Sequence, residues 1–150
     1  MTSDGGEEST ETLLDGIGPS FSRLRPHAPA GRKDISRNLV LNIVADTPGE
    51  ITVGAVAEEL KADPSVASRM VSDCIAAGYL LRAASQADGR RTVLHVTPEG
   101  QALRKQFARS QRDAFERVTA DWPDSERLQF ARLLHKYVEA SAAFRKRQAL

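Results

Sequence analysis

The segment from Asp63 to Gly78 constrains the fold more than any other part of this 150-residue sequence. Aspartate is favourable just before a helix, proline suits the first helical turn, and glycine suits the left-handed residue that ends a helix. Asp63, Pro64 and Gly78 stand at these three positions. The sequence therefore predicts a helix over residues 65–77, with both of its ends marked.

The two faces of this predicted helix differ in chemistry. At about 100° per residue, one arc of about 140° holds only polar residues; they are Ser65, Ser68, Arg69, Ser72 and Asp73. The opposite face is apolar and consists of Val66, Ala67, Met70, Val71, Cys74 and Ile75. Short hydroxyl side chains let a helix approach a DNA groove closely, and arginine can contact guanine or phosphate. Taken alone, the pattern fits an ordinary serine-rich surface helix equally well.

The surrounding sequence predicts a helix-turn-helix followed by a β-hairpin. A short helix is predicted over Val53–Leu60, with Thr52 as its N-cap, and it is joined by a tight turn to the helix described above. After Gly78 the pattern becomes extended, with strands predicted over 79–84 and 92–96. Asp88-Gly89 between them is a hairpin turn signal, and Arg90 and Arg91 follow at once. A hairpin with arginine at its tip, placed after a helix-turn-helix, is typical of a DNA-binding wing.

The remaining segments are predicted to be helical. Helical spacing over 11–24 is interrupted at Gly18-Pro19, where a kink is expected, and residues 25–32 are expected to form a loop. The segment 34–46 predicts a helix capped by Asp34, with Ile35, Leu39, Ile43 and Val44 buried. Ile51-Thr52 predicts a very short strand. Thr97-Pro98-Glu99 begins a helix expected to reach about residue 120, and Pro123 begins the last helix.

Composition excludes several classes of protein. With 27% charged and 41% hydrophobic residues, most of the chain is expected to fold as one soluble domain. It contains no apolar run of about 18 residues and no signal-peptide pattern, so a cytoplasmic location without membrane contact is expected. A single cysteine forms no internal disulfide and no Cys-rich zinc site. Because no nucleophile–base set, phosphate loop or metal-ligand cluster is present, we expect no enzyme activity, no cofactor and no metal.

The charge distribution is uneven although the net charge is only +1. Residues 1–12 contain four acidic residues and no basic residue, so the rest of the chain carries a net charge of +5. The first nine residues are expected to form a disordered acidic tail. A mildly basic body is compatible with DNA binding without requiring it.

Three motifs resemble one known family. They are Val53–Leu60 followed by Pro64-Ser-Val-Ala-Ser-Arg-Met-Val71, the exit Ala77-Gly-Tyr-Leu80, and Asp88-Gly-Arg-Arg-Thr-Val-Leu-His-Val-Thr-Pro-Glu-Gly100. Together, residues 51–103 resemble the winged helix-turn-helix of MarR-type transcriptional regulators. The resemblance implies a mainly α fold with a small β-hairpin wing, flanked by N- and C-terminal dimerisation helices. The implied domains are 10–33 (N-terminal dimerisation helix and loop), 34–100 (winged helix-turn-helix) and 101–150 (C-terminal dimerisation helices).

The resemblance also implies a function and roles for single residues. Family members form homodimers, most repress promoters at inverted repeats, and many release double-stranded DNA when a small ligand or an oxidant acts on them. By position, Ser65, Ser68, Arg69 and Ser72 would face the major groove. Arg90 would enter the minor groove, held by an ion pair with Asp88, and Arg91 would meet phosphate. The implied dimerisation residues are Leu13, Leu14, Ile17, Phe130, Leu134, Tyr137 and Phe144. The chain departs from the family pattern at Pro64 and Cys74.

Several alternatives stay open at this stage. The weak net charge and Pro64 also fit a winged-helix protein-interaction module that does not bind DNA. Repression and activation are not distinguished, and neither the existence nor the identity of a small-molecule ligand follows from the residues. Cys74 lies on the apolar face, which favours a buried, unreactive thiol over a redox switch. His135 and Glu139 are four residues apart, which favours a surface pair over a metal site.

Overall fold

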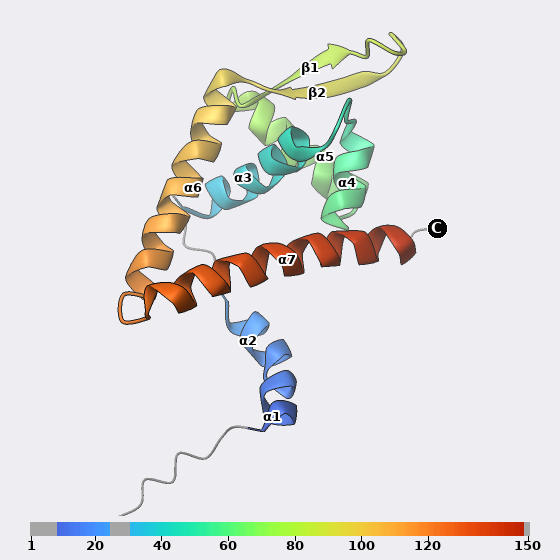
Figure 1. The fold of residues 1–150 in the computed structure, drawn as a ribbon. Coiled ribbons are helices and arrows are strands. Elements are labelled where there is room, and N and C mark those ends of the chain that lie inside the picture. Colours follow the sequence, from blue (N-terminus) through green and yellow to red (C-terminus); the bar gives the residue numbers. More distant parts are fainter. Residues whose placement is uncertain (1–8, 25–30, 149–150) are drawn as a thin grey trace, which may run out of the picture. The chain divides into compact units, whose positions relative to one another are not determined.

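The computed structural model describes residues 9–24 and 31–148, which form seven helices and two strands (Figure 1). The elements are α1 (Thr10–Asp15), α2 (Ile17–Arg23), α3 (Gly31–Asp46), α4 (Val53–Leu60), α5 (Pro64–Ala76), β1 (Leu80–Ala84), β2 (Thr92–Val96), α6 (Pro98–Val118) and α7 (Asp124–Gln148). The predicted fold class, mainly helical with one β-hairpin, is confirmed. Most of the predicted acidic tail and most of the predicted loop 25–32 lie outside the described residues.

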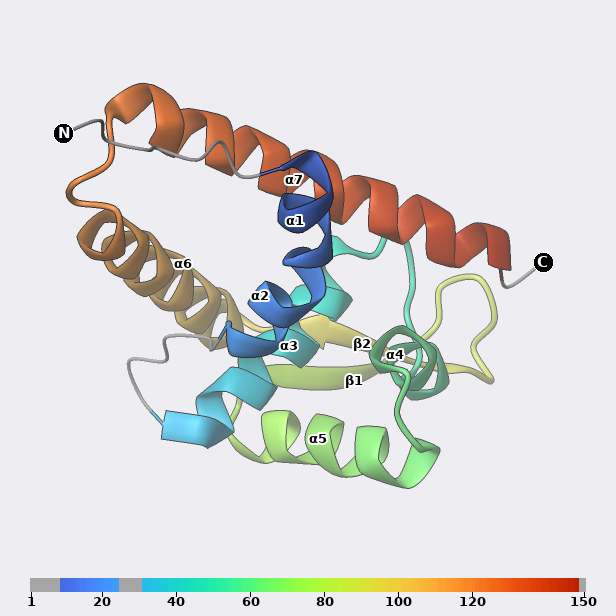
Figure 2. The same cartoon turned by 90° about the horizontal axis from the view of Figure 1, so that it is seen from below.

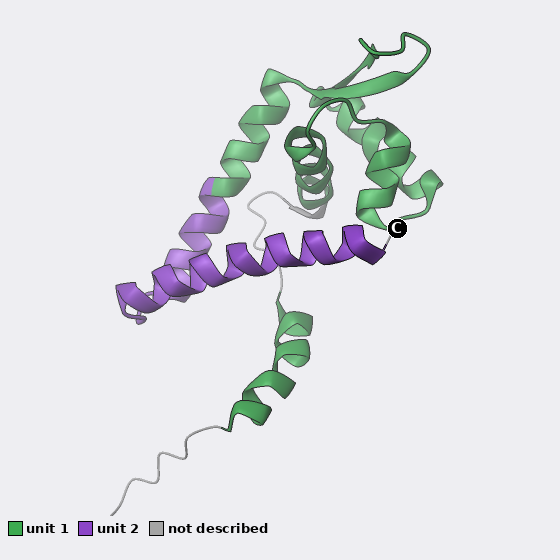
Figure 3. Ribbon diagram, turned by 45° about the vertical axis from the view of Figure 1, so that its right-hand side comes forward, with its two compact units in different colours: residues 1–108 green, residues 109–150 purple. Residues whose placement is uncertain are grey.

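The chain divides into two compact units, Met1–Ala108 and Arg109–Leu150 (Figure 3). Helix α6 begins in the first unit and continues into the second. The predicted domain boundary between residues 100 and 101 lies inside this helix. The predicted domain limits therefore stay predictions.

The helix-turn-helix forms where the sequence predicts it. The side chain of Thr52 caps α4 by accepting a hydrogen bond from Ala55 N at 3.2 Å, and Lys61 ends the helix in the left-handed conformation. Pro64 begins α5, and Gly78 follows its end with a φ of 81°. Asp63 occupies the N-cap position, but its side chain makes no capping hydrogen bond. Its backbone carbonyl accepts from Val66 N and Ala67 N instead.

The hairpin follows the predicted turn. Strands β1 and β2 are antiparallel, with Leu80 opposite Val96 and Ala84 opposite Thr92. Arg91 N donates to Asp88 O at 2.9 Å, and Ser85 N donates to Arg91 O at 2.9 Å, so the loop between the strands is held closed. The predicted strand at Ile51-Thr52 is not formed. One hydrogen bond from Leu94 N to Ile51 O, at 2.9 Å, attaches this segment to β2.

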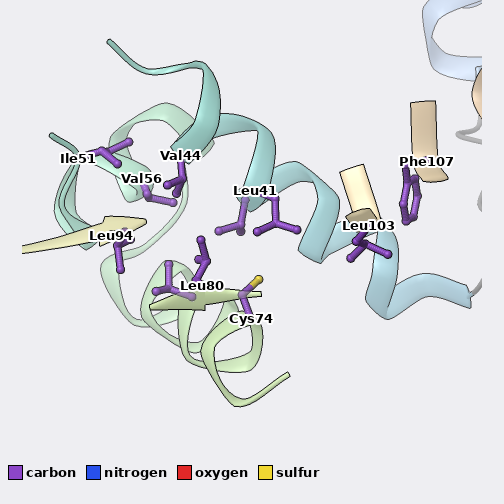
Figure 4. Close-up of a cluster of buried hydrophobic side chains, with 11 residues drawn as sticks. Leu41, Val44, Ile51, Val56, Cys74, Leu80, Leu94, Leu103 and Phe107 are labelled. Atoms are coloured by element: carbon purple, nitrogen blue, oxygen red, sulfur yellow. The ribbon is translucent and has the colours of Figure 1, made fainter. Parts of the chain in front are cut away.

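A single apolar core joins α3, α4, α5, the hairpin and the N-terminal half of α6. Helix α3 packs against α4, α5 and β2 (Figure 2). Buried residues from these elements, β1 and α6 form one cluster (Figure 4); they are Val40, Leu41, Val44, Ile51, Val56, Val71, Cys74, Leu80, Leu94, Leu103 and Phe107. The predicted burial of Cys74 is confirmed. Burial raises the pKa of its thiol to about 11, so the reactive thiolate is scarce at neutral pH.

Three predictions about the helices of the first unit were wrong in detail. Leu39 and Val66 are 48% and 37% exposed, because the core contacts α3 through Val40 and Leu41 and contacts α5 through Ala67. Helix α3 begins at Gly31, so Asp34 lies in its first turn and binds Arg37 rather than capping the helix. Residues before the best capping residue can also adopt the helical conformation, so a capping residue does not by itself fix the residue at which a helix begins.

The N-terminal helices break earlier than predicted. The junction lies at Gly16, between α1 and α2, whereas the sequence indicated Gly18-Pro19. Pro19 is the third residue of α2. The first turn of a helix has no intrahelical partners for its N–H groups, so a proline is tolerated there without a kink.

The second unit is built around the turn between α6 and α7. Helix α6 ends at Val118, slightly before the predicted residue 120, and α7 begins after Pro123 as predicted. Thr119 is buried, and its Oγ1 donates to Phe115 O at 2.7 Å and accepts from Arg127 Nε at 3.2 Å. The Phe130 ring stacks on Phe115, with centroids 5.8 Å apart, and meets Trp122 edge-on at 5.9 Å. These contacts fix the start of α7 against the end of α6.

Candidate nucleic-acid interface

The polar face predicted for α5 is exposed along its length. Ser65, Ser68, Arg69 and Ser72 are all exposed, while the apolar side of the helix contacts the core. Among the described ion pairs, none involves Arg69. The face therefore presents short hydroxyl side chains and one available guanidinium, which matches the donors used to contact phosphates and base edges.

The wing tip is organised by Asp88, but in a different way from the one predicted. Asp88 Oδ1 accepts a hydrogen bond from the backbone N–H of Arg90 at 3.1 Å. Across residues 9–24 and 31–148, the ion pairs do not include one between the Asp88 and Arg90 side chains. Asp88 thus fixes the backbone that carries Arg90, and the Arg90 side chain is exposed at the tip. Arg91 is also exposed.

The base of the wing is attached to the turn before α4 through Glu50, a residue that the sequence did not single out. Ser85 is 5% exposed and donates from its Oγ to Glu50 Oε2, while Gln86 N donates to Glu50 Oε1. The same Ser85 oxygen accepts from Ala87 N at 3.1 Å and Asp88 N at 2.9 Å. The hydrogen bond from Ser85, followed by that from Gln86, lowers the pKa of the Glu50 carboxyl. This link orients the arginine-bearing loop relative to the helix-turn-helix.

Substituting Glu50 with glutamine is expected to loosen the wing in a pH-dependent way. The folded-state pKa of Glu50 is lowered, so its stabilising contribution is present above the ordinary glutamate pKa of about 4.3 and is lost as pH falls through the folded-state value. The melting temperature of the parent should exceed that of E50Q at pH 7, and the difference should shrink below about pH 4. Faster exchange of the Gln86 amide in E50Q is expected at neutral pH. Glu59→Gln, on the exposed side of α4, is the matched control; a parent–E50Q difference that does not change with pH would contradict the role of the carboxylate.

A second network that the sequence did not reveal joins α5 to α3. Arg37 Nε donates to Asp73 Oδ2 at 2.7 Å, Arg37 Nη2 donates to Asp73 Oδ1 at 3.2 Å, and Arg37 Nη1 donates to Asp34 Oδ1 at 3.2 Å. The guanidinium carbon lies 5.7 Å from the ring centroid of Tyr79. The hydrogen bond from Arg37 lowers the pKa of the Asp73 carboxyl. Only the Asp34–Arg37 pair, three residues apart on one helix, could have been recognised from sequence spacing.

The segment joining the end of α5 to α6 is also tightly fixed. Thr97 Oγ1 donates to Gly78 O at 2.6 Å and accepts from Gly100 N at 3.1 Å, so Thr97 caps α6 as the sequence predicted. Thr97 N donates to Tyr79 O at 3.0 Å. The candidate DNA-facing helix is thereby anchored at its C-terminal end to the first turn of α6.

The predicted dimerisation residues share one property, which is a large exposed apolar surface. Their exposed fractions range from 42% to 61%; the residues are Leu13, Leu14, Ile17, Phe130, Leu134, Tyr137 and Phe144. On α7, Phe130, Leu134, Tyr137 and Phe144 form an exposed apolar stripe, and exposed Leu133 and Val138 widen it. Their role in dimerisation stays a prediction.

Two further findings concern other kinds of site. Among the described residues, no helix is both long enough and apolar enough to cross a membrane. Within the same ranges, no group of three or more His, Cys, Asp or Glu side chains is arranged to hold a metal ion.

Comparison with known proteins finds one matching family model and several solved structures of similar fold. Residues 39–91, from α3 to the wing tip, match the family model described as MarR family. RV1404 from Mycobacterium tuberculosis is similar in structure, with a TM-score of 0.68 and 21% identity over 91% of this chain and 96% of that one. A MarR family protein from Bacillus stearothermophilus has a TM-score of 0.62 and 16% identity, over 88% and 92% of the two chains. FabT from Streptococcus pneumoniae, solved in complex with DNA, has a TM-score of 0.55 and 17% identity, over 88% and 87%. No curated protein matches the sequence.

Proposed function

We propose that this chain, whose winged helix-turn-helix belongs to the MarR family, is a dimeric regulator that binds double-stranded DNA and represses transcription at an inverted repeat. The observation that carries the proposal is the joint placement of two exposed arginines. Arg69 lies on the short-side-chain face of α5, and Arg90 lies at the tip of the wing in the same compact unit. In the proposed complex, Ser65, Ser68, Arg69 and Ser72 face the major groove, Arg90 enters the minor groove, and Arg91 contacts phosphate.

The proposed dimer is supported by the exposed apolar helices. Seventeen large hydrophobic side chains are exposed among the described residues, and most of them lie on α1, α2 and α7. Large apolar side chains exposed on three helices are unfavourable in water unless a partner covers them. A second copy of the chain would present two copies of α5, which a near-palindromic site with half-sites about 34 Å apart would accommodate.

The test of this function is binding of the purified protein to the DNA upstream of its own gene, titrated with salt and competed with random DNA of equal length. We expect two protomers per site, an affinity that random DNA does not compete away, and a steep loss of binding as salt rises, because phosphate contacts release counterions. Binding no tighter than to random DNA, followed by no enrichment when genomic fragments are selected, would favour the alternative of a protein-interaction module. A reporter placed downstream of the bound site distinguishes repression from activation.

Removing each exposed arginine is expected to weaken binding in a different way. Arg69→Ala should lose about 1–3 kcal/mol of binding free energy and relax base preference at one position of each half-site, because a base contact is removed. Arg90→Ala should weaken binding to all sequences and reduce the salt slope. Arg132→Ala, which removes the same charge from exposed α7, is the control. Parent-like binding by both test variants would show that the interface is assigned to the wrong residues.

A further inference from the structure

Asp73 carries a negative charge on the surface that we assign to DNA, where such a charge is unfavourable. It lies on the polar side of α5, next to Ser72 and one helical turn after Arg69, and 44% of its side chain is exposed. A carboxylate on this face repels DNA phosphates. It is also four residues from Arg69, the spacing at which oppositely charged side chains on a helix pair with each other. An unrestrained Asp73 would therefore compete with DNA for the Arg69 guanidinium.

The structure holds Asp73 away from that competition. Arg37, on α3, grips both Asp73 oxygens in a two-point contact, with donor–acceptor distances of 2.7 and 3.2 Å. Arg37 is itself fixed by Asp34 at 3.2 Å and by the face of Tyr79, and only 19% of its side chain is exposed. A partly buried bidentate pair is stronger and better defined than an exposed pair between neighbours on one helix. Asp73 is thus neutralised by a residue outside the DNA-facing helix.

We infer that Arg37 is a positioning residue for DNA binding: by holding Asp73, it leaves Arg69 free to contact DNA and removes an uncompensated negative charge from the DNA-facing side of α5. This role rests on the DNA binding proposed above. It makes the effect of losing Arg37 depend on whether Asp73 is present. A direct contact between Arg37 and DNA would not produce that dependence.

The test is a double-mutant cycle in the full-length protein, using Arg37→Gln, Asp73→Asn and the combination of both. R37Q is expected to weaken binding to the specific site by roughly five- to tenfold, through capture of Arg69 and repulsion of phosphate. D73N alone should bind within about twofold of the parent, since the charge that needed compensation is gone. The double variant should recover most of the affinity lost in R37Q. Binding by the double variant as weak as by R37Q would overturn the inference.

A matched control separates this effect from the general loss of an arginine that links helices. Arg104 joins α6 to α3 through Asn42 and Asp46, both at 2.8 Å, and its hydrogen bonds and ion pair among the described residues do not involve α5. The effect of Arg104→Gln on DNA affinity should be the same with and without D73N. All variants are compared below their melting temperatures, as monitored by circular dichroism. Rescue of R104Q by D73N would mean that D73N acts non-specifically, and would overturn the assignment to Arg37.

A measurement without DNA distinguishes failure of this inference from failure of the proposed function. The titration of the Asp73 carboxyl is followed by NMR in the parent and in R37Q. In the parent its midpoint should lie below the ordinary aspartate value, because Arg37 stabilises the charged form. In R37Q the midpoint should rise towards that value. An unchanged midpoint would show that Arg37 does not hold Asp73, whatever DNA binding shows. A raised midpoint in a protein that lacks specific DNA binding would instead reject the proposed function, and the role of Arg37 with it.

Discussion

Substituting Gly100 with alanine is expected to destabilise the winged domain by about 2 kcal/mol or more. A Cβ atom at this position would lie 2.3 Å from Tyr79 O and 2.8 Å from Val96 Cγ1, both well inside normal contact distance. The carbonyl of Tyr79 cannot easily move, because it accepts a hydrogen bond from Thr97 N at 3.0 Å. Relief would therefore require the first turn of α6 to shift away from the end of α5.

The direction of the stability change in G100A is informative, because replacing glycine with alanine ordinarily stabilises a helix. Replacing an unstrained glycine inside a helix with alanine gains about 0.5–1 kcal/mol. Gly54 in α4 is the matched control, because its added Cβ would meet only Thr52 Oγ1, at 3.8 Å. Urea unfolding should show G54A at or above the parent and G100A clearly below it. Equal stability of G100A and the parent would mean that α6 does not approach Tyr79 as closely as described.

The parts of the fold that the sequence predicted are those specified by nearby residues. Strand β2 was predicted at its observed limits, 92–96, because a turn signal and β-branched residues adjoin each other there. Helix α5 was predicted because a proline marks its start and a glycine follows its end. The buried side of α3 was only partly predicted. Apolar residues lie on several sides of the second half of α3, so which of them are buried depends on the elements that pack on the helix, and this explains the exposure of Leu39.

The links that position the candidate interface were not predicted, because they join residues distant in sequence. Arg37 and Asp73 are 36 residues apart, and Glu50 and Ser85 are 35 residues apart. No periodicity or motif connects such pairs. The close approach at Gly100 is similar, since the sequence shows a glycine near a helix start but does not show the carbonyl that excludes a larger residue. The sequence therefore indicated the groups assigned to DNA and the nearby Asp88, but not the distant groups that orient them.

Substituting Leu134 with glutamate is expected to abolish the proposed dimer and lower DNA affinity by about 100-fold or more. Leu134 lies in the exposed apolar stripe of α7, four residues after Phe130 and three before Tyr137. A carboxylate buried in a dimer interface would lose its hydration without gaining a partner, which is strongly unfavourable. A monomer would engage one half-site only, so the gain in affinity from binding two linked half-sites would be lost.

The control for this variant is Ala143→Glu, which adds the same charge to the same helix. Ala143 is exposed and lies nine residues after Leu134, which places it on the opposite side of α7 at about 100° per residue. Val138→Glu changes a second residue of the stripe, so the same result from both variants excludes a folding defect specific to residue 134. Sedimentation equilibrium should find dimers for the parent and A143E, and folded monomers for L134E and V138E. If both stripe variants stay dimeric, the second copy binds elsewhere; if they are monomeric yet bind DNA like the parent, each chain reads its site independently.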